Sequence, residues 1–185
     1  MFSRESLVYA WDNGGRYAEA LLEDVTDEQM VLRPGEPDNP HRMNHPAWIL
    51  GHMSLYYPIV PALLAGEAFD DPADHDLFGF RGRGPQDDVS LYGTKESQLE
   101  RLSTGHEQVA QALLTASEDQ LNRRPSLPRW AEMYPTVEFM LPDLLLMHEN
   151  IHIGQISIWR RAAGLPSVPF PDRTPRTGLV EARGG

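Results

Sequence analysis

Apolar residues recur at spacings of three and four along four long stretches of the chain, and each stretch predicts an amphipathic helix with one buried face. No stretch sustains the strict alternation of apolar and polar residues that would predict a series of strands. The pattern therefore indicates an all-α fold. The four expected helices cover residues 3–23, 44–63, 94–117 and 137–163.

Capping residues and prolines mark the ends of these helices. Asn44 can cap the second helix, because its side chain accepts backbone N–H groups and Pro46 is tolerated in the first turn. Thr94 can cap the third helix in the same way. Pro58 and Pro61 are expected to kink or fray the end of the second helix.

The connections between the helices indicate one domain. Residues 66–93 are rich in Asp, Gly and Pro and are expected to form a long crossover between helices 2 and 3, which makes the predicted fold a four-helix bundle. The fourth helix begins either at Thr136, with a kink at Pro142, or at Pro142 itself. We expect the bundle to occupy residues 1–166 and residues 167–185 to form a Pro-rich tail that is extended unless docked.

Polar side chains interrupt the expected inward stripe of the last helix. His148 and His152 stand four residues apart, so their imidazoles lie roughly 6 Å apart along the axis and can bind one ion. A buried polar group without a partner costs about 1–3 kcal/mol, so these rings are either hydrogen-bonded in the core or bound to a metal. The stripe as given by the spacing is Val137, Leu141, Leu144, His148, Ile151 or His152, Gln155, Trp159 and Ala162.

A third histidine favours the metal hypothesis. His52 lies on the inward stripe of the second helix with Trp48 and Leu55, and sites in helix bundles are built from side chains that project inward from facing helices. Three histidines leave at least one coordination position open for water or substrate, as in catalytic metal sites. Imidazole suits zinc, nickel, copper and ferrous iron, so the pattern predicts a divalent metal ion without selecting one.

The same stretch also matches the letters of a metalloprotease motif. His148, Glu149 and His152 form HExxH, in which Glu149 would act as general base. That motif also needs a third ligand downstream, where the chain offers no histidine and only Asp172 and Glu181 are acidic. Glu149 is turned about 100° from His148, so we expect it to be a surface charge and rank the metallohydrolase second.

The other polar and small residues near these motifs allow two readings each. His106 lies on the stripe of the third helix, either at the edge of the core or as a partner of the metal ligands. His45 either lines the pocket or flanks the start of the second helix. Gly154 and Gln155 either allow close approach and bind a ligand, or simply pack. The Gly14-Gly15 pair hints at close approach by a neighbour, and His41 and His75 are expected in solvated loops.

Composition narrows the classes of function. The formal net charge is −11 and no dense basic block occurs, which argues against a nucleic-acid partner and is compatible with a neutral or cationic small molecule. The absence of cysteine removes disulfides and any protein thiol nucleophile. Pro58, Pro61 and His52 interrupt the best candidate membrane span, residues 47–65, and no signal-peptide layout precedes it. We therefore expect a cytoplasmic protein without membrane association.

Two motifs give the chain a family resemblance. Residues 44–52 read NHPAWILGH, with the pattern W-x-x-G-H, and residues 148–155 read HENIHIGQ, with the pattern H-x-x-x-H-x-G-Q. Both resemble the DinB-like (YfiT-type) metal-binding bundle family, as does Trp11-Asp12-Asn13, and the likeness covers residues 3–166. The resemblance implies a four-helix bundle with a long connection between helices 2 and 3, often dimeric, and a divalent metal on His52, His148 and His152.

The resemblance also suggests a reaction. Characterised relatives include metal-dependent transferases and isomerases that use a low-molecular-weight thiol, and the sulfur would have to come from a cosubstrate because the chain has no cysteine. Three hypotheses follow: a metal-dependent enzyme related to thiol S-transferases, an HExxH-type metallohydrolase, and a non-catalytic stress-response protein that binds a metal or small molecule.

Overall fold

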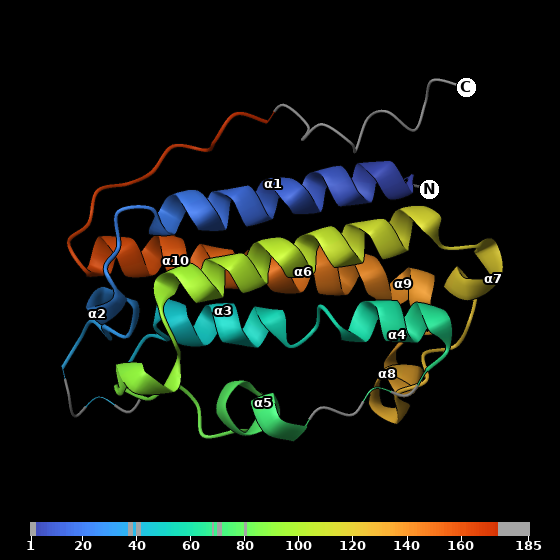
Figure 1. Cartoon of the computed structure of the whole chain (residues 1–185), viewed down its shortest axis with the longest axis horizontal. Coiled ribbons are helices and arrows are strands. Elements are labelled where there is room, and N and C mark those ends of the chain that lie inside the picture. The colour runs from blue at the N-terminus through green and yellow to red at the C-terminus, as the bar shows by residue number, and fades with distance from the viewer. Residues whose placement is uncertain are drawn as a thin grey trace.

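The protein is built from helices around one core. The computed structural model describes residues 3–36, 39, 42–67, 69, 72–79 and 81–173, and within these residues every regular element is helical. This confirms the all-α prediction. The bundle consists of α1 (Arg4–Leu22), α3 (Pro46–Ser54) followed by α4 (Ile59–Ala65), α6 (Lys95–Thr115), and α9 (Val137–Pro142) continued by α10 (Glu149–Ala162) (Figure 1). Short helices in the connections are α2 (Asp27–Met30), α5 (Pro72–Phe78), a 3-10 turn (Val89–Leu91), α7 (Glu118–Leu121) and α8 (Pro128–Met133).

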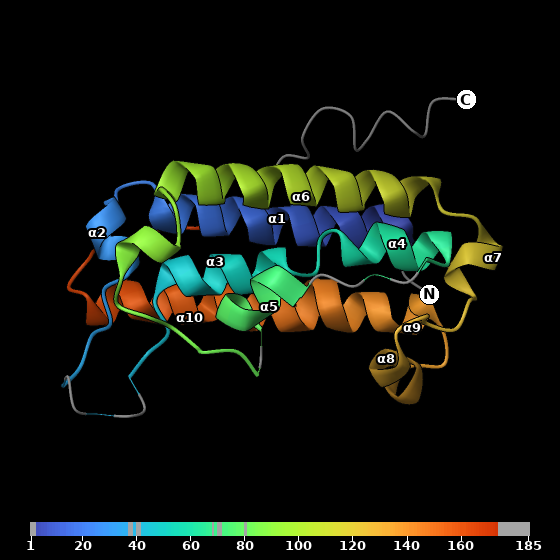
Figure 2. The same ribbon diagram turned by 60° about the horizontal axis from the view of Figure 1, so that its bottom comes forward.

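The long helices pack side by side as four rods. The first rod, α1, contacts α6 and α10, and α3 contacts the same two helices. The second rod, α3 with α4, runs in the same direction as α6, so the chain between them returns along the length of the bundle, with α5 packed on α3 (Figure 2). The described part of residues 66–93 is thus a crossover that lies along the second rod.

The second rod begins one residue later than the sequence suggests. His45, and not Asn44, is the N-cap of α3: the backbone N–H of Trp48 donates to His45 Nδ1 at 3.1 Å. Pro46 occupies the first turn, as expected. Histidine lies outside the residue types that usually cap helices, which is why the sequence pattern favoured Asn44.

The second rod is broken between Ser54 and Ile59. Pro58 has no N–H and starts α4 as its N-cap, so the predicted kink is a full interruption of the helix. By length and composition alone residues 46–65 could cross a membrane, but 78% of this window is buried inside the bundle. Burial of that kind is typical of a core helix.

The last rod is continuous but contains a wider turn. It begins after Thr136, the first of the two predicted starts. In an α-helix residues four apart drift by about 40° around the axis. Residues Asp143–His148 form a π-helical segment, whose turns are wider and offset this drift. The buried side is therefore Val137, Leu141, Leu145, Glu149 and Ile153. Leu144 and His148, which the spacing places on the inward stripe, are only partly buried, and the alternative Ile151 is exposed.

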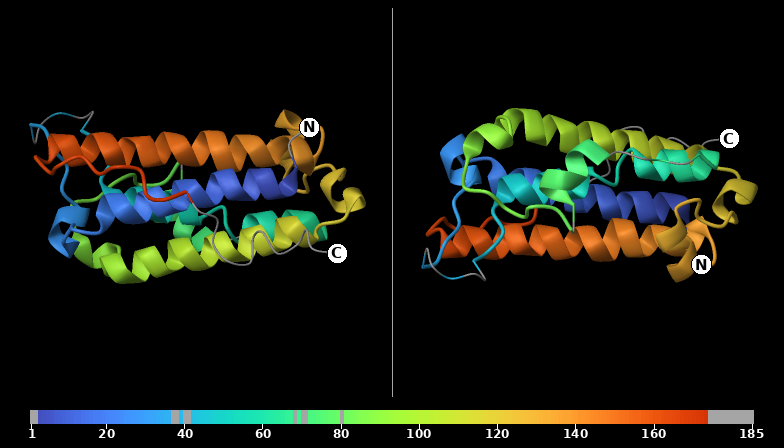
Figure 3. Two further views of the ribbon diagram at one scale, coloured as in Figure 1. Left: turned by 90° about the horizontal axis from the view of Figure 1, so that it is seen from above. Right: turned by 90° about the horizontal axis from the view of Figure 1, so that it is seen from below.

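The described part of the tail docks on α1. Arg160 of α10 donates to the carbonyl oxygen of Pro166 at 2.9 Å. The hydroxyl of Tyr9 in α1 donates to the carbonyl oxygen of Arg173 at 2.7 Å. Phe170 stacks on Tyr17 with ring centroids 4.2 Å apart. Residues 165–173 thus follow the outer face of α1, as Figure 3 shows. The domain boundary at residue 166 stays a prediction.

Candidate metal site

Three imidazole rings from two rods meet at one point, between α3 and the last rod. Nε2 of His148 lies 3.2 Å from Nε2 of His52 and 3.2 Å from Nε2 of His152. Tetrahedral coordination with metal–nitrogen bonds of about 2.0–2.1 Å separates neighbouring ligand nitrogens by about 3.3 Å. Two of the three separations match that value, and the ligand atoms of all three predicted residues lie within 4.8 Å of one another, so the structure brings together a group that could hold one metal ion.

Hydrogen bonds on the other side of two rings aim the Nε2 lone pairs at this point. His52 Nδ1 lies 2.7 Å from the carbonyl oxygen of Phe78, and because a carbonyl only accepts, Nδ1 carries the hydrogen. His152 Nδ1 donates in the same way to Oε1 of Gln155 at 3.2 Å. In both rings Nε2 is then a free acceptor, which is the tautomer that a metal ligand needs.

The rings are held in their neutral form. Burial, together with the neighbouring His152 and His52, lowers the pKa of His148 to about 3. Burial and the neighbouring His52 lower the pKa of His152 to about 4, against the hydrogen bond to Gln155, which raises it. Burial also lowers the pKa of His52, against the hydrogen bond to Phe78, which raises it. A hydrogen on Nε2 of His148 could be donated to Nε2 of His52 or to Nε2 of His152, but not to both. A divalent cation satisfies all three, so this group can hold a metal ion.

Aromatic side chains surround the nitrogen donors. Trp48 stacks on His52 at 4.9 Å, and Tyr56 places its ring edge-on to His148 at 4.8 Å. Trp130 of α8 stacks in turn on Tyr56 at 6.0 Å. Sequence reasoning missed Tyr56 and Trp130. Tyr56 stands four residues after His52 and could have been found from that spacing, whereas α8 is distant in sequence and gives no such signal.

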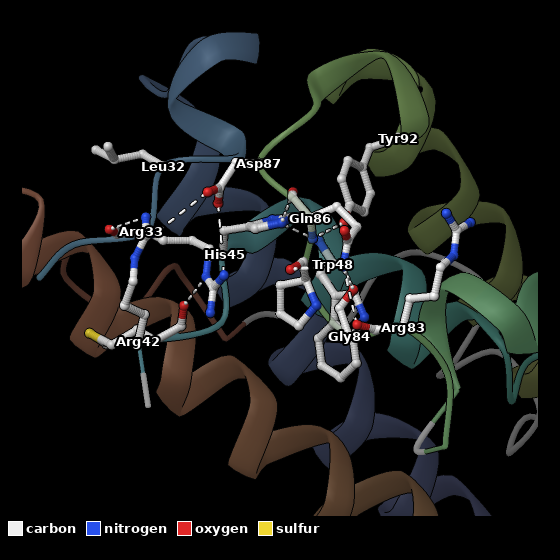
Figure 4. Close-up of polar contacts among 12 residues, drawn as sticks. Leu32, Arg33, Arg42, His45, Trp48, Arg83, Gly84, Gln86, Asp87 and Tyr92 are labelled. Atoms are coloured by element: carbon white, nitrogen blue, oxygen red, sulfur yellow. Dashed lines mark hydrogen bonds and ion pairs between the residues drawn. The ribbon is translucent and has the colours of Figure 1, made fainter. Parts of the chain in front are cut away.

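The crossover is attached to the face of α3 that carries His52. Nε2 of His45 donates to the carbonyl oxygen of Gln86 at 2.9 Å (Figure 4). Nε1 of Trp48 donates to the carbonyl oxygen of Leu77, also at 2.9 Å. Together with the bond from His52, three side chains on successive turns of α3 donate to the crossover backbone. The crossover thereby orients the ring of His52.

Gly51 makes this attachment possible. A Cβ at position 51 would lie 2.1 Å from the ring of Phe78, so only glycine lets the crossover approach α3 this closely. The WxxGH pattern therefore has a physical reading: Trp48 and His52 hold the crossover, and Gly51 gives it room.

The family assignment agrees with this geometry. The chain matches the family described as the DinB superfamily over residues 10–156. It belongs to the DinB superfamily. No curated protein gives a significant match. The region shared with the DinB superfamily contains His52, His148 and His152, and the docked tail lies outside it.

A second polar cluster anchors the crossover of this DinB-superfamily protein. Asp87 lies 3.3 Å from the guanidinium of Arg42 and 3.8 Å from that of Arg33 (Figure 4). Arg42 also donates to the carbonyl oxygen of Arg33 at 3.0 Å. These contacts join Arg33 and Arg42, which precede α3, to the crossover. His45 therefore acts as a cap and a crossover anchor, beside the metal ligands and not among them.

The structure corrects the expected role of Glu149. Its carboxylate is buried, and Oε1 lies 2.8 Å from Nε2 of His106, which is buried as well. The prediction that Glu149 is a surface charge is wrong because the π-helical segment rotates this residue toward the core. His106 is a core residue that contacts Glu149 and none of the three metal ligands that the sequence predicts.

The glycine predictions had mixed outcomes. A Cβ at Gly15 would lie 2.6 Å from the His106 ring, so the predicted close approach at the Gly14-Gly15 pair is confirmed. At Gly154 no described atom lies within 4 Å of such a Cβ, so close approach within the chain is wrong there. His75 is exposed, as expected, but it lies in α5 and not in a loop, and His41 lies outside the described residues.

Proposed function

We propose that the protein is a metal-dependent enzyme related to low-molecular-weight-thiol S-transferases or isomerases, with a divalent ion on His52, His148 and His152. One observation carries the proposal: three neutral imidazoles converge, with Nε2 of His148 at about the separation of tetrahedral ligands from Nε2 of both His52 and His152. Three ligands leave an open coordination position, which is the arrangement of catalytic and not of structural sites.

The chain's own residues suggest how a substrate would be held. A bound divalent ion would lower the pKa of a thiol or water, which supplies a nucleophile near neutral pH. The sulfur has to come from a cosubstrate, because the chain contains no cysteine. Trp48, Tyr56 and Trp130 line the site with aromatic rings, and such rings bind the apolar part of an electrophilic small molecule.

The geometry speaks against the metallohydrolase alternative. A general base must reach the water that it activates, within about 3 Å. Glu149 instead directs its carboxylate to His106 on the core side of the last rod and is 4% exposed. The HExxH letters therefore describe two metal ligands and one buried core residue.

Metal analysis of the purified protein beside His52→Ala tests the proposal. We expect close to one divalent ion per chain in the wild type and a strong loss in the variant, with unchanged far-UV circular dichroism. A wild type without metal, or a variant that keeps it, would contradict the proposal. The metal-loaded protein is then assayed with thiols and electrophiles, and absence of turnover across a broad panel would indicate the non-catalytic, small-molecule-binding role instead.

We also propose that the protein forms a homodimer through the last rod. Met147, Ile151 and Ile158 are 56%, 54% and 53% exposed and form, with Gly154, a stripe with spacings of four, three and four. This is the spacing of a two-helix seam. In an antiparallel pair centred near Gly154, Ile151 would face Ile158 of the second copy, so the stripe is complementary to itself.

A further inference from the structure

A buried carboxylate lies behind the metal site, on the core side of the last rod. Oε1 of Glu149 in α10 lies 2.8 Å from Nε2 of His106 in α6. Both side chains are about as buried as the apolar core, at 4% and 6% exposure. This contact is therefore a direct polar connection between α6 and α10.

Aromatic rings from α1 and from the connection between α3 and α4 pack around this contact. His106 stacks on Trp11 of α1 at 3.9 Å and meets Tyr57 edge-on at 5.3 Å. Tyr57 interacts with the Glu149 carboxylate, and burial together with that negative charge raises the pKa of Tyr57 well above its usual value.

Two glycines give these rings their space. A Cβ at Gly15 would lie 2.6 Å from the His106 ring, and one at Gly105 would lie 2.1 Å from the Tyr57 ring. The surroundings thus leave the carboxylate little freedom. A buried polar group is costly without a partner, so keeping the 2.8 Å contact restricts the orientation of α10 about its axis.

The position of Glu149 connects this restriction to the metal site. It directly follows His148 and is the first residue after the π-helical segment. One residue corresponds to 100° of rotation about a helix axis, so holding Glu149 toward α6 holds His148 toward α3. The π-helical segment, with its wider turns, leaves the rotation at this junction less determined by the preceding helix.

We propose that Glu149 and His106 are positioning residues: their buried contact sets the rotation of the last rod that presents His148 and His152 to His52. This inference rests on the proposed metal site and goes beyond it, since neither residue touches the ion. Loss of the contact should weaken metal binding even where the protein stays folded.

The test measures Co²⁺ and Zn²⁺ affinity, the cobalt absorption spectrum and urea unfolding of the metal-free protein. The variants are Glu149→Ala, His106→Ala, their double variant, and the conservative Glu149→Gln. The matched control is Asp24→Ala, which removes another polar contact of α10, the ion pair with Arg160 at 2.6 Å, outside the metal ligands.

We expect each alanine variant to lose about 10–100-fold in metal affinity and to change the cobalt spectrum, as when other groups that orient metal ligands are removed. The double variant should lose little more than the single ones, because the two residues act as a unit. Glu149→Gln should recover most of the affinity, and Asp24→Ala should stay within about threefold of wild type.

Unchanged affinity in the folded variants would overturn the inference while leaving the metal site intact. An equal loss in Asp24→Ala, at similar stability, would overturn it too, by showing a general effect of destabilisation. If the alanine variants do not fold, the inference is tested instead with Glu149→Gln and His106→Gln, by their cobalt spectra and metal affinities. If wild type binds no metal while His52→Ala behaves identically, the proposed function fails and the inference with it.

Discussion

His45 shows how one side chain can serve two elements. Its Nδ1 accepts from the N–H of Trp48 and so carries no hydrogen, which leaves Nε2 to donate to Gln86. Burial lowers the pKa of His45 to about 4, in agreement with the neutral form that the cap requires. The start of α3 and the attachment of the crossover thus depend on the same neutral ring.

We predict that His45→Ala lowers the free energy of unfolding by about 1–3 kcal/mol, through loss of a cap and of a second hydrogen bond. His45→Asn should lose less, because asparagine is a good N-cap but is too short to reach Gln86 as well. Urea unfolding of both variants measures the difference. Equal losses would show that the cap contributes nothing measurable.

At the scale of residues, the sequence identified the three converging histidines, because HxxxH and the stripe of the second helix are local patterns. The role of Glu149 could not be predicted, since it depends on the π-helical turn, which leaves no signal in apolar spacing. Trp130 reaches the site only through the packing of α8, a contact between segments far apart in sequence.

Among the elements, the crossover departs most from its sequence-based description. Its composition of Asp, Gly and Pro indicates a loop, yet it is attached to α3 by side chains on three successive turns. The spacing places the donors Trp48 and His52 on one helix face and His45 near its start, but the acceptors of all three are backbone carbonyls, which residue identity does not encode. The helices could therefore be predicted from the sequence, whereas the attachment of the crossover to α3 could not.

We predict that Gly51→Ala displaces the crossover, because the new Cβ would lie 2.1 Å from the Phe78 ring. Stability should fall by about 1–3 kcal/mol, as in other overpacked cores, and metal affinity should fall because His52 loses its acceptor. Combining it with Phe78→Ala should relieve part of the loss. Additive losses in a double-mutant cycle, measured by urea unfolding, would contradict this account.

For the molecule as a whole, buried neutral histidines predict a pH dependence. The folded-state pKa values of His45, His148 and His152 lie near 4, 3 and 4, below the value of about 6.5 for unfolded histidine. The unfolded chain therefore binds more protons than the folded one once the pH drops below about 6.5. Stability of the metal-free protein should be constant above that pH and fall toward pH 4.

Urea unfolding of the metal-free protein between pH 8 and pH 4 measures this dependence. His45→Asn should reduce the steepness, since one of the buried titrating histidines is removed. A flat profile between pH 6.5 and pH 4.5 would contradict the prediction.

A charged side chain placed in the proposed interface tests the dimer. Ile151→Glu or Ile158→Glu should convert the dimer to a monomer, because the new carboxylate would be buried against an apolar seam in the second copy. Val89→Glu, on an exposed apolar residue of the 3-10 turn, is the matched control and should leave the assembly intact. Analytical ultracentrifugation gives the mass, and a monomeric wild type would refute the proposed homodimer.

The hydrogen bond between His52 and the Phe78 carbonyl has a consequence for the life of the protein in a cell. The carbonyl oxygen of Phe78 both orients the His52 ring and holds the crossover on α3. Binding of the proposed metal ion and order in the crossover are therefore thermodynamically linked, each favouring the other. Metal starvation should then loosen residues 77–79 and 81–86 before the bundle itself opens. Proteases would find their first cleavage site there, so the supply of the ion would set how long the polypeptide survives.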